Sequence, residues 1–250
     1  MKIITSSASH HAMLFAYVTR EVVATFGQRG EDAVIRAVRR YGLQRGRRMA
    51  MRAKQDGVMP DGMSYDLYGE WECFPGQVEC TQSLEDGGYI LSFHRCPWHT
   101  DWKRFGMMEY GKCYCGYVDA AIIEGLGLEN SALCASRMDG HPTCDLRFCD
   151  RSYTEEDLRR QQAQKENLHG QEKMPWEYHV GHLYQALRDV LQEEFGSAGR
   201  RALKQAMKYY EIHFGPVAKK LVYEYADLNY DVLPYYEGPA HGNNAGEETV

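Results

Sequence analysis

Hydrophobic residues recur at helical spacing near the start of the chain. Between Met13 and Phe26 an apolar residue returns every three or four positions, and a glycine follows, as is typical of a helix C-cap. A second run with the same period begins near Glu31 and contains Gly42 and Gly46. Because glycine weakens a helix by about 1 kcal/mol relative to alanine, these two glycines indicate a bend or a close contact with another helix. The pattern predicts a helical hairpin.

The same helical period returns between His179 and about Asp227, where the chain resembles its own first hairpin. Any two amphipathic hairpins share some matches, but coincident glycines are harder to obtain from periodicity alone. We therefore predict a duplicated hairpin that forms a pseudosymmetric helical layer around the rest of the protein or supplies a dimerisation surface. A shift of 169 residues pairs Phe26-Gly27 with Phe195-Gly196, Gly30 with Gly199, Ala33 with Ala202, Ala37 with Ala206, Tyr41 with Tyr210 and Gly46 with Gly215.

The middle of the chain combines the two-residue period of strands with short helical runs. Glu85-Asp86-Gly87-Gly88 and Asp139-Gly140 are turn sequences that flanking strands would pair across. In the strand after the first turn, Tyr89, Leu91 and Phe93 share one face. The expected elements are, in order, a strand over 65–73, paired strands over 77–84 and 89–95, helices over 98–105 and 110–124, and paired strands over 131–138 and 143–149.

These elements predict an α+β fold. Its centre would be an antiparallel sheet arranged as hairpin, helix and hairpin, flanked by the N- and C-terminal helical hairpins. Residues 1–150 would form the main domain. Residues 151–232 would add a charged linker helix, running from Ser152 to about Glu166, and the C-terminal hairpin, packed on the same core. Residues 233–250, rich in glycine, proline and asparagine, would form a tail.

Composition narrows the functional class. The chain has 250 residues, of which 44% are hydrophobic and 26% charged, as in ordinary globular proteins. Its net charge of -6 gives no electrostatic basis for nucleic acid as the main partner. No export signal or membrane-spanning run is recognisable, so we expect a cytoplasmic protein whose eight cysteines are reduced thiols, metal ligands or catalytic groups.

Six of the eight cysteines fall between Arg95 and Asp150. Two Cys/His pairs in this region, Cys96 with His99 and His141 with Cys144, have the spacing of metal ligands and would complete a tetrahedral zinc site if the fold joined them. The alternative is two unrelated pairs that pack locally. The cofactor therefore stays open, with a divalent metal such as zinc as the candidate.

Cys115 and Asp119 form a second candidate pair. Four residues apart on the expected helix, they would share a face. Cys115 could attack a substrate if a cationic or hydrogen-bonding neighbour such as His99 activated it, or Asp119 could act as the general base for water. The alternative for Cys115 is a small buried hydrophobic residue.

Two further groups of polar residues could reach the rim of a site. The second helix carries Arg39, Arg40, Arg45, Arg47, Arg48 and Arg52, of which one or two could bind a carboxylate substrate while the rest face solvent. Arg48 is the residue we select. His10 and His11 are expected at the surface.

Short motifs in the right order resemble the L-2-amino-thiazoline-4-carboxylic acid hydrolase family over roughly Ala12 to Asp150. They are Tyr41-Gly42, Arg45-Gly46-Arg47-Arg48, Cys96-Pro97-Trp98, Gly106-Met107-Met108-Glu109-Tyr110-Gly111, Tyr114-Cys115, Asp119, Gly140 and Cys144-Asp145-Leu146-Arg147-Phe148. The resemblance implies hydrolytic opening of a cyclic amidine, 2-amino-thiazoline-4-carboxylate. Among the candidate residues, Cys96, Cys115, Asp119 and Cys144 match family positions.

We therefore predict a hydrolase that opens a small cyclic amidine or lactam-like ring by attack at the C–N carbon. The expected catalytic residues are Cys115, Asp119, Cys96 and His99, and the expected substrate-binding residues are Cys144, Arg48 and Tyr114. The competing hypothesis is a non-catalytic sensor that binds a small molecule or metal in the same cysteine pocket. For either function we expect a homo-oligomer that binds neither nucleic acid nor membrane.

Overall fold

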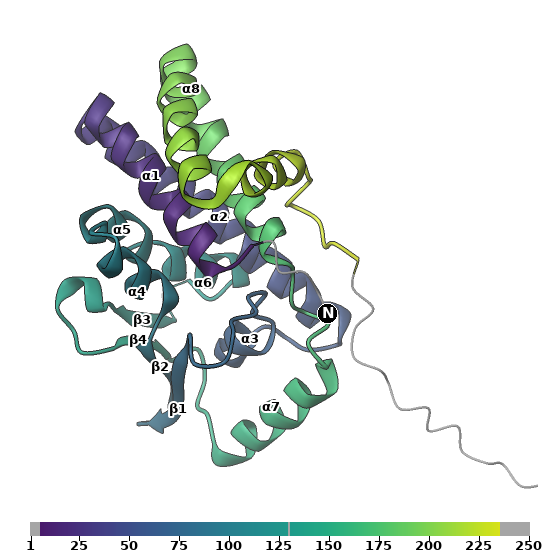
Figure 1. The fold of residues 1–250 in the computed structure, drawn as a ribbon. Helices are drawn as coiled ribbons and strands as arrows, with labels where there is room; N and C mark the ends of the chain where they lie inside the picture. The colour runs from purple at the N-terminus through teal and green to yellow at the C-terminus, as the bar shows by residue number, and fades with distance from the viewer. Residues whose placement is uncertain (1–5, 130, 236–250) are drawn as a thin grey trace, which may run out of the picture.

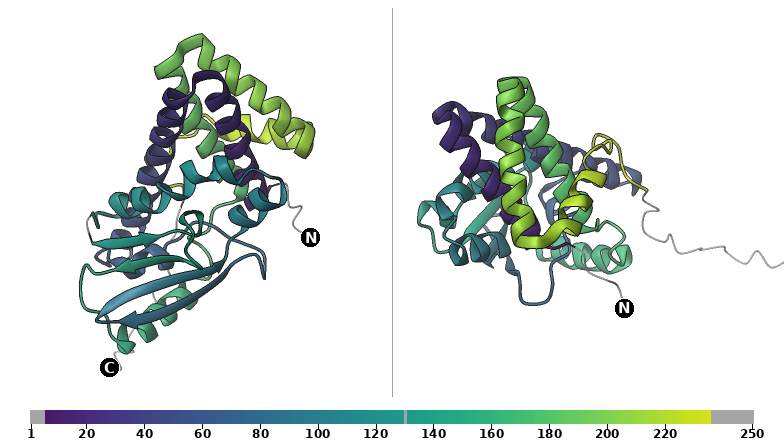
Figure 2. Two further views of the ribbon diagram at one scale, coloured as in Figure 1. Left: turned by 90° about the vertical axis from the view of Figure 1, so that its left-hand side faces the viewer. Right: turned by 45° about the horizontal axis from the view of Figure 1, so that its top comes forward.

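The computed structural model describes residues 6–129 and 131–235 (Figure 1). Long helices gather at one end of the molecule and an antiparallel sheet forms the other, as Figure 2 shows from two further sides. The long helices are α1 (Ala8–Phe26), α2 (Gln28–Gln55) and α8 (Trp176–Tyr225). The predicted α+β fold, with a central sheet and helical hairpins on either side of it in sequence, is confirmed.

The sheet contains both predicted hairpins. Its strands are β1 (Glu79–Glu85), β2 (Gly88–Arg95), β3 (Ala132–Ala135) and β4 (Cys144–Phe148), in the spatial order β1-β2-β4-β3 with every neighbour antiparallel. Tyr89 and Leu91 are buried on one face of β2, as the two-residue period predicts. Leu91 pairs with Leu146 of β4, which joins the two hairpins into one sheet.

The predicted strand over 65–73 is wrong. Residues 62–67 instead form α3 (Gly62–Leu67), a short helix whose N-cap Asp61 accepts a hydrogen bond from the backbone of Ser64 while the Ser64 side chain accepts one in return. An irregular segment then carries Trp71 toward the core. Tyr65 and Leu67 point inward from one helical turn and Trp71 from the loop beyond it, so the apolar spacing resembled a strand.

The predicted helix over 110–124 is two helices. After α4 (Pro97–Arg104), the chain forms α5 (Met108–Cys115) and α6 (Val118–Leu126), with a break at Gly116 and Tyr117. Cys115 therefore ends one helix and Asp119 lies in the first turn of the next. The prediction that they share a face of a single helix is therefore wrong, although both line the same cavity.

The predicted second hairpin is present inside α8, which is helical over 176–195, 197–214 and 216–225 with non-helical residues at Gly196 and Gly215. Gly27 and Gly196 have nearly the same backbone angles, φ 56° and ψ -137° against φ 53° and ψ -125°. The rings of Phe26 and Phe195 stack with centroids 3.9 Å apart and planes 3° apart. The two hairpins thus meet at their equivalent corners.

A single hydrophobic core runs from these helices to the sheet and includes Phe15, Tyr41, Leu91, Leu146 and Leu187. The N-cap of the linker helix, α7 (Glu155–Leu168), is Thr154, two residues after the predicted N-cap Ser152. Thr154 and Asp157 form the capping box in place of the predicted pair Ser152 and Glu155. Most of the predicted tail lies outside the described residues. None of the helices in the described ranges combines the length and the apolar composition that crossing a membrane requires.

Candidate active site

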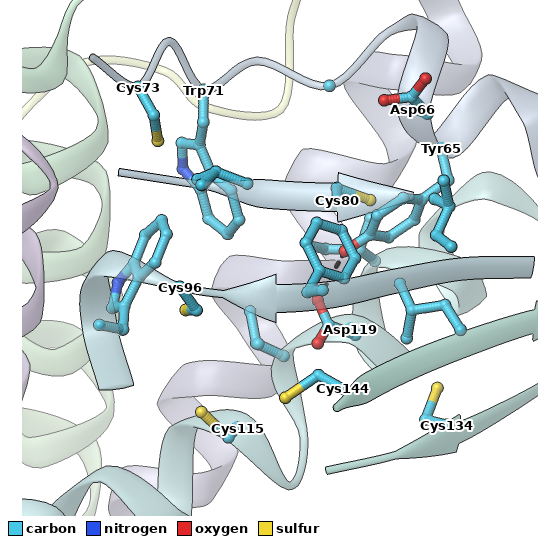
Figure 3. A pocket seen from close by; sticks show the side chains of 18 of the residues that line it. Tyr65, Asp66, Trp71, Cys73, Cys80, Cys96, Cys115, Asp119, Cys134 and Cys144 are labelled. Atoms are coloured by element: carbon cyan, nitrogen blue, oxygen red, sulfur yellow. Dashed lines mark hydrogen bonds between the residues drawn. The ribbon is translucent and has the colours of Figure 1, made fainter. Parts of the chain in front are cut away.

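A cavity of about 370 Å³ lies between the sheet and helices α2, α5 and α6. Figure 3 shows side chains from the sheet, the helices and the loop after α3 around one space. Its volume is in the range of small-molecule sites. Thiols are unusually frequent in its wall: Cys73, Cys80, Cys96, Cys115, Cys134 and Cys144 all line it.

The candidate groups come from element ends that meet at this space. Cys96 is the N-cap residue of α4, directly after β2, and Cys144 begins β4. Cys115 is the last residue of α5, and Asp119 lies in the first turn of α6. Strand β2 forms part of the wall through Leu91 and Phe93.

Helix α6 reaches this position because three glycines let it touch α2. A Cβ on Gly42 would lie 2.6 Å from the Cβ of Ala121, and one on Gly46 would lie 2.0 Å from the carbonyl oxygen of Ile122. A Cβ on Gly125 would lie 2.4 Å from the carbonyl oxygen of Leu43. Gly42 and Gly46 therefore mark a close helix contact, as predicted from the sequence. This contact holds α6, with Asp119, against α2.

Asp119 is half-buried, with its carboxylate at the cavity wall, and accepts a 2.6 Å hydrogen bond from the Tyr65 hydroxyl. Removal from bulk water raises the pKa of Asp119, while the Tyr65 hydrogen bond and the nearby Arg45 charge oppose the rise. A carboxyl group with a raised pKa is a stronger base than an ordinary carboxylate, which suits a group that accepts and returns a proton.

The thiols nearest Asp119 are held in the protonated form. Burial raises the pKa of Cys96 to about 12, and burial followed by the proximity of Cys96 and Asp119 raises the pKa of Cys115 well above its usual value. The pKa of Cys144 is also raised by burial, although its sulfur accepts a backbone N–H from Arg137 at 3.3 Å. Because the thiolate is the nucleophilic form, none of these thiols is activated by its surroundings.

Arg45 is a fully buried cation on the cavity wall. Its Nε donates to Glu70 at 3.3 Å, and its guanidinium carbon lies 3.6 Å from the ring centroid of Trp71. Its Nη1 is buried and has no hydrogen-bond partner among the described residues. The same is true of the hydroxyl of Tyr114, a residue that also lines the cavity. The residues that line the cavity thus include a carboxyl group and two residues with unpaired donors.

Residues 7–148, more than half of the chain, match the family described as L-2-amino-thiazoline-4-carboxylic acid hydrolase. The protein belongs to this family. No curated protein and no solved structure matches the chain. The match to the L-2-amino-thiazoline-4-carboxylic acid hydrolase family includes the six cavity cysteines and Asp119, whereas α7 and α8 lie outside it.

Five of the seven residues selected from the sequence line the cavity of this family member: Cys96, Tyr114, Cys115, Asp119 and Cys144. The other two do not. His99 lies half-buried in the first turn of α4, away from the cavity lining. Arg48 is fully buried, donates twice to Glu70 at 3.0 and 2.8 Å and once to the carbonyl oxygen of Tyr230 at 2.7 Å, and does not line the cavity.

The suggested zinc set is not assembled. Cys96 and Cys144 reach the cavity, but His99 and His141 do not line it. Within residues 6–129 and 131–235, no group of three or more histidine, cysteine, aspartate or glutamate side chains is placed to hold a metal ion.

The expectation of surface histidines at the N-terminus is wrong for His11, which is fully buried. Its Nδ1 accepts a 3.0 Å hydrogen bond from the indole of Trp98, so Nε2 carries the proton and donates to the Tyr41 hydroxyl at 3.1 Å. Burial holds the pKa of His11 well below its usual value. A neutral His11 therefore holds the indole of Trp98 in place by this hydrogen bond, and Trp98 in turn lines the cavity.

Sequence reasoning missed two site residues, Tyr65 and Arg45. Tyr65 was assigned to a strand, and only the fold brings it to Asp119, 54 positions away. Arg45 stood in the same arginine run as Arg48 and three positions before it. The two arginines differ in how they contact Glu70: its carboxylate and the Tyr230 carbonyl occupy the donors of Arg48, whereas Nη1 of Arg45 has no partner among the described residues. No local sequence pattern reveals where Glu70 lies.

Proposed function

We propose that the protein is a hydrolase that opens a small cyclic amidine or lactam-like ring of the 2-amino-thiazoline-4-carboxylate type by attack at the ring C–N carbon. Its family carries the name of such a hydrolase. The observation that carries the proposal is the Asp119 carboxyl group, half-buried at the cavity wall, hydrogen-bonded to Tyr65 and raised in pKa. These are the properties of a group that moves protons in hydrolysis.

In the proposed reaction, Asp119 accepts a proton from water as the water oxygen bonds to the amidine carbon. The carbon becomes tetrahedral, and the electrons of its C=N bond move to the ring nitrogen. Asp119 returns the proton to this nitrogen. Asp119 then takes the proton of the new hydroxyl group and passes it to the same nitrogen as the carbonyl group forms and the ring C–N bond breaks, so the nitrogen departs as an amine. One water molecule is consumed, the ring opens and Asp119 ends in its starting state. Tyr65 keeps the carboxylate in place through its 2.6 Å hydrogen bond.

This route assigns the thiols to the wall of the site. Cys115 as a nucleophile is the other mechanism that the sequence allows, and it requires loss of a proton that the surroundings of Cys115 retain. Water activated by Asp119 has no such requirement. We therefore assign Cys96, Cys115 and Cys144 to shaping the cavity around the sulfur and carbon atoms of the ring, and Tyr114 to binding the substrate.

A panel of cyclic amidines, lactams and cyclic ureas tests the proposal. The purified protein should convert 2-amino-thiazoline-4-carboxylate, or a close analogue, to a product heavier by one water molecule, measured by mass spectrometry. Oxygen from labelled water should appear in the product. Absence of turnover for every ring in the panel would refute the proposal.

The competing function is a small-molecule sensor that uses the same cavity, and the protonated thiols are the observation that favours it. A sensor would bind a member of the panel without changing it, so binding measured by calorimetry beside the turnover assay separates the two. A cytoplasmic location and a homo-oligomeric state stay predictions from the sequence.

A further inference from the structure

Two residues that line the cavity each have a buried hydrogen-bond donor that finds no partner among the described residues. The donors are Nη1 of Arg45 and the hydroxyl of Tyr114. A buried donor without an acceptor costs free energy, so native proteins rarely keep one unless a ligand, ion or water supplies the acceptor. The two residues are also near each other, since each contributes to the pKa of the other. The pair therefore indicates that something with acceptor atoms binds at this part of the wall.

The Arg45 guanidinium is held in a fixed orientation. Its Nε edge faces Glu70, and the ring of Trp71 covers one of its faces at 3.6 Å. Nη1 has no hydrogen-bond partner among the described residues, so the edge that carries it is where a ligand could bind. Approach in the plane of the guanidinium is the geometry in which arginine binds carboxylates.

The charge of Arg45 is only partly offset. Both oxygens of Glu70 accept hydrogen bonds from Arg48, and one also accepts from Arg52, so Arg45 shares the Glu70 carboxylate with two other cations. The distances reflect this sharing, because the Arg45 contact of 3.3 Å is longer than the Arg48 contacts of 3.0 and 2.8 Å. A buried cation with a shared partner favours the binding of an anion beside it.

We propose that Arg45, with Tyr114 beside it, binds the acidic group of the substrate and makes the cavity select ring compounds that carry a carboxylate over neutral ones. This inference rests on the proposed function for the kind of ring that enters the cavity. It replaces the sequence-based choice of Arg48, whose donors are occupied by Glu70 and Tyr230. In this assignment Asp119 transfers protons at the ring, and Arg45 anchors the acidic group.

The test is binding of a matched pair of aromatic rings that resist hydrolysis, 2-aminothiazole-4-carboxylate and 2-aminothiazole-4-carboxamide. Calorimetry should show that the wild-type protein binds the carboxylate about 10- to 100-fold more tightly, as a charge-assisted hydrogen bond implies. Quenching of Trp71, which stacks on Arg45, gives a second readout of the same event. Equal affinity for the two rings would overturn the proposal and would mean that a bound water satisfies Arg45.

Variants assign the preference to Arg45. Arg45→Met should reduce the carboxylate preference to near unity, whereas Arg47→Met, an exposed arginine on the same helix, should preserve it. If Arg45→Met does not fold, Tyr114→Phe decides, because it removes only the hydroxyl and should weaken the carboxylate about 3- to 10-fold while leaving the amide unchanged. An unaltered preference in a folded Arg45→Met variant, or in Tyr114→Phe when the arginine variant fails to fold, would contradict the assignment.

Kinetics separate this inference from the proposed function. Arg45→Lys should raise KM for 2-amino-thiazoline-4-carboxylate with a smaller change in kcat, since the anchor is present in both the bound substrate and the transition state. Asp119→Asn should lower kcat and keep the carboxylate preference of the aminothiazole pair. If the protein prefers the carboxylate but hydrolyses no ring, the proposed function is wrong and the role of Arg45 is supported. If it hydrolyses a ring but shows no preference for the carboxylate, the role of Arg45 is wrong and the proposed function is supported.

Discussion

The first hairpin, formed by α1 and α2, and the second, formed by segments 176–195 and 197–214 of α8, turn through glycines with nearly identical backbone angles. Beyond the turn they use the same close contact. A Cβ on Gly30 would lie 2.6 Å from the carbonyl oxygen of Val22, and one on Gly199 would lie 2.2 Å from that of Leu191, its equivalent partner. The two hairpins thus share the geometry of their helix corners.

The two hairpins differ farther along the chain from this corner. Helix α2 continues past Gly42 and Gly46, packs on α6 and brings Arg45 to the cavity. The second hairpin ends at Gly215, and the position equivalent to Arg45 is Phe214, whose ring stacks on His10 at 4.0 Å. One copy therefore carries the chemical groups, and the other supplies packing. The same scaffold serves both because site residues occupy only the part of α2 beyond the shared geometry.

Gly46→Ala should have the largest effect, because it disrupts the part of α2 that has no equivalent in the second hairpin. The new Cβ would meet the backbone of Ile122 at 2.0 Å, and backbone cannot move aside as a flexible side chain can. We expect a loss of about 3 kcal/mol in the free energy of unfolding and a lower kcat/KM, because Arg45 and Asp119 move apart. Denaturant titration and the hydrolysis assay measure the two effects.

Gly215→Ala is the matched variant in the second hairpin. Gly215 has φ 86° and ψ 168°, a backbone conformation that essentially only glycine adopts, and no described residue lies close to where its Cβ would be. Alanine should therefore cost about 1–3 kcal/mol of backbone strain and leave activity unchanged. Equal losses of stability and activity in Gly46→Ala and Gly215→Ala would remove the distinction between the hairpins.

Acid should weaken both hairpins at equivalent positions. Burial lowers the pKa of His10 to about 4 and that of His179 to about 3. The unfolded chain takes up these protons below pH about 6.5 and the folded chain does not, so stability is full above that pH and falls as pH decreases. Each histidine should contribute about 1.4 kcal/mol per pH unit in this window. Chemical denaturation between pH 7 and about 4.5 measures the slope.

His10→Gln and His179→Gln are the test pair for this slope. Each should reduce the pH dependence by a similar amount if the two positions are equivalent. A slope that changes in one variant alone would show that the duplication does not extend to these side chains.

Gly30→Ala and Gly199→Ala should each destabilise the protein by about 1–2 kcal/mol. Alanine stabilises a helix by roughly 1 kcal/mol relative to glycine, but the steric strain of the close contact is larger than this gain. The loss should be slightly larger at Gly199, where the contact is shorter. Neither variant should alter KM, since both corners lie away from the cavity lining. Thermal unfolding and steady-state kinetics check these outcomes, and stabilisation in either variant would contradict the shared contact.

The smallest effect should come from the stacked pair that joins the corners. Phe26→Leu and Phe195→Leu should each cost about 1 kcal/mol, and the double variant should cost less than their sum, because either change already removes the stack. A double-mutant cycle by denaturation measures this coupling. Full additivity would mean that the two rings do not stabilise one another.

Most of the fold follows from local patterns. The hairpins of the sheet are specified by Glu85-Asp86-Gly87-Gly88 and Asp139-Gly140, and the long helices by their apolar period and their glycines. The errors arose where local patterns are ambiguous. One capped turn at Asp61 gives the same apolar spacing as a strand, and the break after Cys115 uses Gly116 in an ordinary helical conformation.

The site was predictable only in part, for a related reason. Cys96, Cys115, Asp119 and Cys144 carry family motifs, so the sequence identifies them without the fold. Arg45 and Tyr65 acquire their roles from Glu70 and Asp119, which are distant in sequence. Such pairings depend on how α2, α3 and α6 pack, and no period within one segment encodes that.

The central claim is that Asp119, held by Tyr65 on a helix that α2 positions, activates water in the cavity. Steady-state kinetics of Asp119→Asn and Cys115→Ser on 2-amino-thiazoline-4-carboxylate test it most directly. We predict that Asp119→Asn lowers kcat by about 10²- to 10⁴-fold, as loss of a general acid–base does, while Cys115→Ser keeps most of the activity. An inactive Cys115→Ser beside an active Asp119→Asn, with a substrate adduct on Cys115 in the wild-type mass spectrum, would contradict it.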